Sequence, residues 1–147
     1  MDKVFLRCPS CRAVNRLPKE KIRSRPVCGE CKTPLAYPVV PVNASSYNYA
    51  NEVESFPGAV LVDFWSPTCG YCLRLSPVLE ELAREKAGIL KIVKIDVSKE
   101  SVLAGRFNIT GVPYLILYSG GKRMADLPGA VPKDELLGWI VSHLGAL

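Results

Sequence analysis

Cysteine is the residue type with the clearest capacity for chemistry in this sequence, because all six cysteines fall into tight pairs. Each pair has the spacing Cys-x-x-Cys, and the pairs are Cys8 with Cys11, Cys28 with Cys31, and Cys69 with Cys72. In a secreted chain, six cysteines could form three disulfides, whereas tight pairs in a chain without a signal peptide favour metal or redox chemistry. Only three consecutive apolar residues precede Cys8, too few for the apolar region of a secretory signal.

The first two pairs have the spacing of a four-thiolate zinc site, with sixteen residues between Cys11 and Cys28. A gap of two residues lets both sulfurs of a pair reach one tetrahedral ion. The apolar residues of this segment are too few to hold roughly 35 residues together, so metal binding would supply the missing free energy of folding. We therefore predict one structural zinc per chain, bound by Cys8, Cys11, Cys28 and Cys31, with no open position for catalysis.

The positive charge of the sequence lies in the same N-terminal quarter. Residues 1–36 hold nine Lys or Arg against three Asp or Glu, whereas residues 37–147 hold ten against eleven. A basic segment raises the alternative of nucleic-acid binding, but no aromatic residue between Cys8 and Cys31 could stack on a base. Four thiolates and one Zn²⁺ would also lower the formal charge of the chain from +5 to +3. Nucleic acid is therefore the weaker alternative.

The third pair, Cys69-Gly-Tyr-Cys72, lies where a strand gives way to a helix. Residues 59–65 are almost continuously apolar, which is typical of a strand buried on both faces. A helix is expected from about Cys69 to Lys86, with Pro77 inside it. A helix N-terminus lowers the pKa of an exposed thiol and makes it nucleophilic near neutral pH. The two sulfurs are also close enough to form a disulfide, so this pair predicts dithiol redox chemistry.

Strands and helices alternate beyond residue 37 and must position these cysteines. Prolines after the last ribbon cysteine mark a boundary between a small zinc ribbon (the ribbon, residues 1–37) and a larger domain (residues 38–147). The expected elements of the larger domain are an edge strand at 39–42, a helix from Ser45 or Ser46 to Ser55, strands at 59–65 and 89–97, a helix at 99–107, strands at 114–118 and 122–127, and a helix from Pro132. The inner side of the helix after Cys69 is expected to carry Leu73, Leu75, Val78, Leu79 and Leu82. This order predicts an α/β fold with a mixed sheet, and no apolar run is long enough to span a membrane.

From about Val39 to the C-terminus the sequence resembles the thioredoxin family. The motifs that carry the resemblance are Leu61-Val-Asp-Phe-Trp-Ser-Pro-Thr-Cys-Gly-Tyr-Cys72, Pro77, Lys94-Ile-Asp96, Ile109-Thr-Gly-Val-Pro113, Gly120-Gly121 and Gly129. With the preceding four-cysteine ribbon, the chain is similar to the bacterial thioredoxin 2 type, which carries an N-terminal zinc-binding extension. The resemblance implies a thioredoxin-like fold, with a mixed central sheet flanked by helices and preceded by a small zinc ribbon.

The resemblance also implies roles for residues around the third pair. Cys69 would attack a substrate disulfide, and Cys72 would resolve the mixed disulfide. Asp63, a carboxyl group in an apolar strand, would have a raised pKa and exchange a proton with Cys72 through water, unless it is only a satisfied core carboxylate. Lys94 would be the partner near that carboxyl group, unless it is an ordinary exposed strand residue.

A second group of residues would meet the substrate. Pro113 would be a cis proline packed against the cysteines, and the backbone of Val112 would pair with a substrate strand. Trp65 would flank the substrate surface, which Gly70 and Tyr71 would complete. The alternative for Trp65 is a role in packing alone.

Three positions depart from the usual thioredoxin pattern. Gly70-Tyr71 stands where the family usually has Gly-Pro, Thr68 stands where tryptophan is usual, and Tyr114 follows Pro113 where threonine is common. The dipeptide between the cysteines tunes thiolate stability and hence the reduction potential. We expect a couple that is less strongly reducing than that of a Gly-Pro thioredoxin.

The function that these expectations favour is a cytoplasmic protein-disulfide reductase that uses the Cys69-Gly-Tyr-Cys72 dithiol. Its redox-active disulfide would need no organic cofactor. The resemblance implies disulfide-containing protein substrates and a thioredoxin-reductase-type flavoenzyme that uses NADPH, and we expect a monomer without membrane contact. The alternatives are a redox-responsive zinc-binding interaction or chaperone-like protein, whose ribbon releases zinc on oxidation, and a nucleic-acid-binding ribbon joined to a redox domain.

Overall fold

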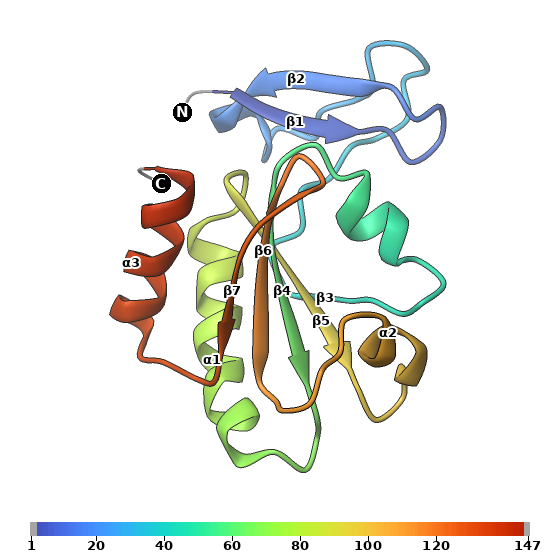
Figure 1. The fold of residues 1–147 in the computed structure, drawn as a ribbon. Helices are drawn as coiled ribbons and strands as arrows, with labels where there is room; N and C mark the ends of the chain where they lie inside the picture. The colour runs from blue at the N-terminus through green and yellow to red at the C-terminus, as the bar shows by residue number, and fades with distance from the viewer. Residues whose placement is uncertain (1–2, 146–147) are drawn as a thin grey trace.

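The core of the computed structural model, which describes residues 3–145, is a five-stranded mixed sheet (Figure 1). The strand order is β3-β5-β4-β6-β7. The bounds are Val42–Asn43 (β3), Ala59–Trp65 (β4), Leu90–Asp96 (β5), Tyr114–Ser119 (β6) and Lys122–Pro128 (β7). Strands β3, β4 and β5 are parallel, while β6 runs antiparallel to β4 and β7 runs antiparallel to β6. The predicted α/β fold with a mixed sheet is confirmed.

Helices cover both faces of this sheet (Figure 1). On one face lie α1 (Gly70–Glu85) and α3 (Lys133–Leu144), and on the other lie α2 (Ser101–Arg106) and the short π-helix η2 (Ala50–Glu54). Successive residues of β4 point to opposite faces, so Leu61 packs on the α1 side and Val62 on the α2 side. Burial on both faces explains the continuous apolar run of β4. No helix within residues 3–145 is long and apolar enough to cross a membrane.

The expected helix from Ser45 or Ser46 to Ser55 needs correction. The segment begins as a turn and becomes the π-helix only at Ala50–Glu54. The side-chain oxygen of Asn48 accepts a hydrogen bond from the backbone N–H of Ser45 at 2.8 Å. The Ser45 hydroxyl in turn accepts a hydrogen bond from the backbone N–H of Tyr47 at 3.2 Å, so Ser45 does cap the segment. The departure from a regular helix comes later, where the N–H of Ser55 bonds to the carbonyl oxygen of Ala50, five residues back.

Two further predictions were wrong in detail. The edge strand expected at 39–42 is shorter and later, at Val42–Asn43, because Pro41 has no N–H for the sheet. Leu73 was expected on the inner side of α1 and is 55% exposed. The buried residues of α1 are Cys72, Leu75, Leu79, Leu82 and Ala83.

The ribbon forms a small sheet of its own. Strands β1 (Lys3–Arg7) and β2 (Val14–Pro18) pair antiparallel, and the 3-10 turn η1 (Lys19–Lys21) follows. The buried side chains of the two strands join the apolar cluster on the α2 side of the large sheet, and they are Val4, Leu6 and Leu17. Shared apolar burial therefore holds the ribbon on the larger domain.

The ribbon lies at the end of the large sheet where β4 and β5 begin (Figure 1). Gly88, just before β5, has a φ of 93°, and a Cβ at this glycine would stand 3.0 Å from Cδ1 of Ile22 in the ribbon. Val4 and Phe5 line the same hollow as Ala59, the first residue of β4. Since β4 runs away from the ribbon, its last residue and the start of α1 lie at the opposite end of the sheet.

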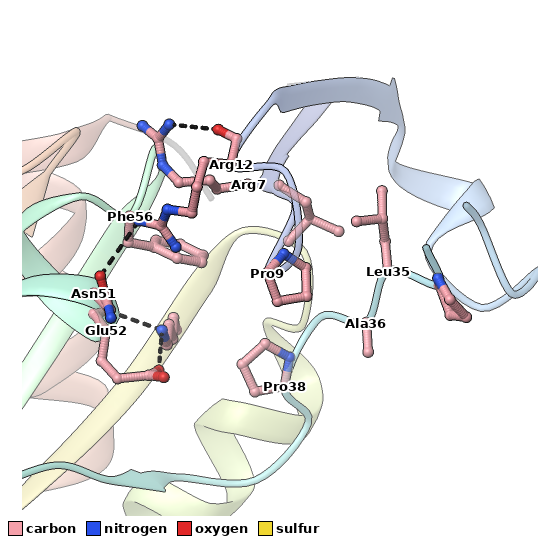
Figure 2. Close-up of a pocket in the computed structure, with 12 residues that line it drawn as sticks. Arg7, Pro9, Arg12, Leu35, Ala36, Pro38, Asn51, Glu52 and Phe56 are labelled. Atoms are coloured by element: carbon pink, nitrogen blue, oxygen red, sulfur yellow. Dashed lines mark hydrogen bonds and ion pairs between the residues drawn. The ribbon is translucent and has the colours of Figure 1, made fainter. Parts of the chain in front are cut away.

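Polar contacts reinforce this junction around a hollow of about 500 Å³ (Figure 2). The Nε of Arg7 donates to the carbonyl oxygen of Ser55 at 3.0 Å, and Arg12 donates to the hydroxyl of the same serine at 3.1 Å. Across the hollow, Lys91 is buried and pairs with the carboxylate of Glu52 at 2.7 Å. The two arginines thus attach the ribbon to the segment that ends η2.

Candidate redox site and candidate metal centre

The third cysteine pair lies at the end of the sheet farthest from the ribbon, where β4 leads into α1. Cys69 is the N-cap of α1, because its Sγ accepts a hydrogen bond from the backbone N–H of Cys72 at 3.1 Å. Cys69 is half-buried, whereas Cys72 is only 2% exposed. The strand-to-helix turn therefore places one accessible sulfur beside one buried sulfur.

The buried sulfur is a weak acid. Burial raises the pKa of the Cys72 thiol to about 12, and the hydrogen bond with Cys69 and the charge of Asp63 act in the same direction. At neutral pH Cys72 therefore keeps its proton. Any step in which Cys72 is the nucleophile needs a nearby base.

Asp63 is a carboxyl group of β4 that points to the α1 side of the sheet. It is completely buried, and neither carboxyl oxygen has a hydrogen-bond partner among residues 3–145. Burial raises the pKa of Asp63 to about 7, against the opposing charge of Lys94. The oxygens are not satisfied as those of a structural core carboxylate would be. A carboxyl group with this pKa can take up and return a proton near neutral pH.

Lys94 stands beside Asp63 on the neighbouring strand, as its register partner in the parallel β4–β5 pair. Its ammonium group nevertheless donates to Oγ of Ser76 at 3.1 Å and lies 4.5 Å from the centre of the Trp65 ring. Lys94 is half-buried, unlike an ordinary exposed strand residue. Ser76 was not among the site residues expected from the sequence. Its place four residues after Cys72, on the same face of the helix, is the signal that could have found it.

The loop before β6 supplies another wall of the site. The peptide bond between Val112 and Pro113 is cis, as expected, and Pro113 is buried. The Cys69 thiol donates to the carbonyl oxygen of Val112 at 3.6 Å. The accessible sulfur and the Val112 backbone therefore lie side by side. Tyr114, the residue after Pro113, directs its hydroxyl to the carboxylate of Asp126 on β7.

The residues between the two cysteines face outward. Tyr71 is 62% exposed, and the guanidinium carbon of Arg74 lies 5.0 Å from the centre of its ring. At Gly70, no atom lies within 4 Å of the position that a Cβ would take. Thr68 is exposed and shares a hydrogen bond with Ser66. A cation–π pair therefore occupies the place where the family usually has proline.

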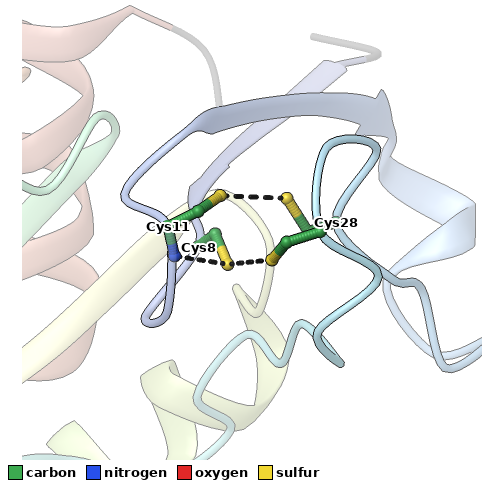
Figure 3. A group of neighbouring side chains, drawn as sticks. Cys8, Cys11 and Cys28 are labelled. Carbon is green, nitrogen blue, oxygen red and sulfur yellow. Dashed lines mark hydrogen bonds between the residues drawn. The ribbon is translucent and has the colours of Figure 1, made fainter.

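The four ribbon cysteines come together as their spacing predicts (Figure 3). Their Sγ atoms all lie within 4.8 Å of one another. Contacts between the two Cys-x-x-Cys turns measure 3.5 Å for Cys8 with Cys31 and 3.6 Å for Cys11 with Cys28. Four sulfurs that each stand about 2.3 Å from one zinc ion are about 3.8 Å apart. The set therefore fits one tetrahedral metal ion.

Hydrogen-bond donors surround the ribbon sulfurs. The backbone N–H of Ser10 donates to Sγ of Cys8 at 3.4 Å. The backbone N–H of Cys31 and then the side-chain amide of Asn15 lower the pKa of the Cys28 thiol to about 6. Such donors favour the thiolate, which is the form that binds a metal. A set of four thiolates leaves no position open for a substrate.

Known proteins that resemble this chain are thioredoxins. The family model described as "Thioredoxin" matches residues 39–142, and the one described as "Thioredoxin 2, N-terminal" matches residues 7–33. Thioredoxin C-3 of Corynebacterium nephridii is 31% identical over 137 residues, which are 93% of this chain and 93% of that protein. The thioredoxin of Bacillus subtilis (strain 168) is 38% identical over 103 residues, 70% of this chain and 97% of that protein. Among solved structures, a mutant thioredoxin from Halobacterium salinarum NRC-1 matches with a TM-score of 0.68 at 31% identity, over 76% of this chain and 97% of that chain.

Proposed function

Since this chain belongs to the thioredoxin family and is a protein-disulfide oxidoreductase, we propose that it reduces protein disulfides through Cys69 and Cys72. One observation carries the proposal. The half-buried Cys69 sulfur caps a helix beside the Val112 carbonyl, and a buried second thiol lies behind it within the influence of the Asp63 carboxyl group. Thiol–disulfide exchange needs an accessible thiolate and a second thiol within reach.

In the first step, the Cys69 thiolate attacks one sulfur of a substrate disulfide. A bond forms between Cys69 Sγ and that sulfur, the substrate S–S bond breaks, and the other substrate sulfur leaves as a thiolate that takes a proton from solvent. The N–H of Cys72 and the N-terminus of α1 stabilise the negative charge on Cys69 before the attack.

In the second step, Cys72 resolves the mixed disulfide. Its proton passes to the Asp63 carboxylate, its Sγ attacks Cys69 Sγ, and the bond between Cys69 and the substrate breaks. The released substrate thiolate takes a proton, so the substrate gains two electrons and the Cys69–Cys72 disulfide remains. Lys94 influences this step as the cation beside Asp63. A thioredoxin-reductase-type flavoenzyme that draws on NADPH would return the two electrons.

The substrate-facing roles are part of the same proposal. The Val112 backbone and Pro113 align an extended segment of the substrate beside Cys69. Trp65 and the exposed Gly70-Tyr71 dipeptide form the surface that such a segment meets. The contact between the Cys69 thiol and the Val112 carbonyl oxygen supports these roles, because this backbone lies beside the sulfur that we propose to react.

We also propose that the ribbon binds one structural zinc ion per chain through Cys8, Cys11, Cys28 and Cys31. When bound, the ion cross-links the two turns and contributes free energy of folding. The domain boundary between residues 37 and 38 is likewise a proposal, as is a monomer without an organic cofactor. The cytosol is the proposed compartment, because its reducing conditions preserve free thiolates in both centres.

A trapping experiment tests the order of attack. The Cys72→Ser protein, mixed with insulin as a disulfide substrate, should accumulate a mixed disulfide at Cys69, because the resolving thiol is absent. The Cys69→Ser protein should accumulate none. Mass spectrometry identifies the bridged cysteine, and a trapped complex in the Cys69→Ser protein, or in neither, would overturn the proposal. Turnover of NADPH with a thioredoxin reductase tests the proposed partner.

The exposed residues Cys11 and Cys31 favour a second candidate function, redox-responsive zinc binding. An oxidant can reach these two residues, whereas Cys8 and Cys28 are buried. Oxidation would release zinc and change the contacts that the ribbon makes with partners. A peroxide titration that oxidises Cys69 fully without releasing zinc would exclude this candidate.

A further inference from the structure

Lys94 has a nearby partner that it does not use. Asp63 is its register neighbour on β4 and points to the same face of the sheet, so an ion pair is within reach of the flexible lysine side chain. Among residues 3–145, however, both carboxyl oxygens of Asp63 are without a hydrogen-bond partner. Other contacts of the ammonium group therefore compete with the carboxyl group.

Ser76 and Trp65 supply those contacts. The Lys94 Nζ lies 3.1 Å from Oγ of Ser76 and 4.5 Å from the centre of the Trp65 ring, within the range of a cation–π contact. Ser76 follows Cys72 by one turn of α1, so its hydroxyl stands on the helix face that carries the buried thiol. The Lys94 ammonium group thus contacts both α1, through Ser76, and the sheet, through Trp65.

We propose that Ser76 is a positioning residue that holds the Lys94 ammonium group against α1 and the Trp65 ring, and thereby keeps it from pairing with the Asp63 carboxylate. The proposal rests on the proposed function, since Asp63 is the base that takes the proton of Cys72. A carboxylate paired directly with an ammonium ion stays ionised down to low pH and is a weak proton acceptor. An unpaired buried carboxyl group is a stronger base, matched to neutral pH.

Lys94 is the charged side chain that faces Asp63 from the neighbouring elements. The residues that face Asp63 are Lys94 from β5, Cys72 from α1 and the uncharged Leu115 from β6. Lys94 also lines two open hollows, whose other charged residues are Glu80, Arg84, Asp96, Lys99 and Glu100. Among the described residues, the Lys94 ammonium group donates its side-chain hydrogen bond to the Ser76 hydroxyl.

The Ser76→Ala variant tests the proposal, because it removes the hydroxyl and keeps a residue that favours the helix. We expect the ammonium group to approach the carboxylate and the pKa of Asp63 to fall by about one unit. In reduced, substrate-free protein with ¹³C-labelled aspartate, the carboxyl resonance of Asp63 reports this titration directly by NMR. Ser76→Thr keeps a hydroxyl at the same position and should restore the wild-type titration.

The Lys94→Met variant distinguishes an effect of Ser76 on the position of the ammonium group from a general change in packing. In Lys94→Met the cation is absent, so the addition of Ser76→Ala should cause no further shift in the Asp63 titration. An equal shift in that background would overturn the proposal, as would an unchanged titration in Ser76→Ala alone.

Activity provides a separate readout. In Ser76→Ala, the pH profile for resolution of a mixed disulfide by Cys72 should move to lower pH, with a rate about threefold lower at neutral pH. If the wild-type protein reduces no disulfide, the proposed function fails, while the Asp63 titration still tests the role of Ser76. If the wild-type protein is active and the titration does not respond to Ser76→Ala, the positioning role alone fails.

Discussion

The ribbon and the end of β4 use the same Cys-x-x-Cys spacing and surround it differently. In the ribbon, four sulfurs lie within 4.8 Å of one another, and two turns face each other across them. At the end of β4, one sulfur is half-buried and accessible, and the other is buried between helix and sheet. The spacing therefore sets only the reach of two sulfurs. Their neighbours decide whether the sulfurs suit a metal ion or a substrate disulfide.

Thiol acidity differs within each centre. In the ribbon, hydrogen-bond donors lower the pKa of Cys28 to about 6, whereas burial and the three neighbouring thiols raise the pKa of Cys11 to about 12. Burial raises the pKa of Cys72 to about 12 and that of Asp63 to about 7, so the thiol loses its proton only during the reaction. Because the centres lie at opposite ends of the sheet, we expect that each can be changed without the other.

The largest effect is expected for Cys69→Ser. Loss of the nucleophile should lower the rate of insulin disulfide reduction by at least about a thousandfold. The zinc content should stay at one ion per chain, because the ribbon is remote from this residue. Turbidity of reduced insulin and metal analysis measure the two quantities. Full activity in this variant, or loss of its zinc, would contradict the separation of the centres.

The reciprocal change is Cys28→Ser, which removes one metal ligand. We expect loss of bound zinc and local unfolding of the β1–β2 hairpin, with a loss of stabilisation on the order of 5 kcal/mol. Hydrogen exchange should speed up in the ribbon and remain slow in α1. The rate of insulin reduction should stay within about twofold of wild type. A large loss of activity would show that the ribbon and the redox site are coupled.

Asp63→Asn tests how much the unpaired carboxyl group lowers the free energy of unfolding. Folded Asp63 keeps its proton up to a pH of about 7, while the unfolded carboxyl group has an ordinary pKa of about 3.9. Between these values the folded state binds more protons, so the free energy of unfolding falls as the pH rises. Asp63→Asn should therefore raise the free energy of unfolding at pH 8 by up to about 4 kcal/mol, with little gain at pH 4. Denaturant titrations at both pH values measure the free energy of unfolding. An equal gain at both pH values would show that ionisation of the buried carboxyl group is not its cause.

The smallest effect is expected for Tyr71→Pro. Proline restricts the first turn of α1 before the disulfide closes, so the disulfide form loses less conformational entropy. We expect the reduction potential of the Cys69–Cys72 couple to fall by about 30 mV, a tenfold change in the equilibrium constant. Tyr71→Ala is the matched control without ring closure, and a glutathione redox titration compares the three proteins. A potential that stays the same or rises would refute the expectation.

Local patterns made much of the redox domain predictable. The strand expected at 59–65 is β4 (Ala59–Trp65), and the helix expected from about Cys69 to Lys86 is α1 (Gly70–Glu85). A buried strand and the helix after it leave apolar patterns among near neighbours in the chain. The π-helical form of η2 was not predictable in this way, because no apolar pattern marks the bond from the Ser55 N–H to the Ala50 carbonyl oxygen five residues back.

The candidate sites divide along the same line. The order of residues along the chain was enough to pair the cysteines, to separate a candidate metal cluster from a candidate redox pair and to single out Asp63, because those signals depend on spacing and on neighbours in the sequence. The docking of the ribbon at the far end of the sheet and the contact of Lys94 with Ser76 became visible only in three dimensions. Both depend on segments distant in sequence, and side chains of β4, β5 and α1 meet only once helix and sheet have packed.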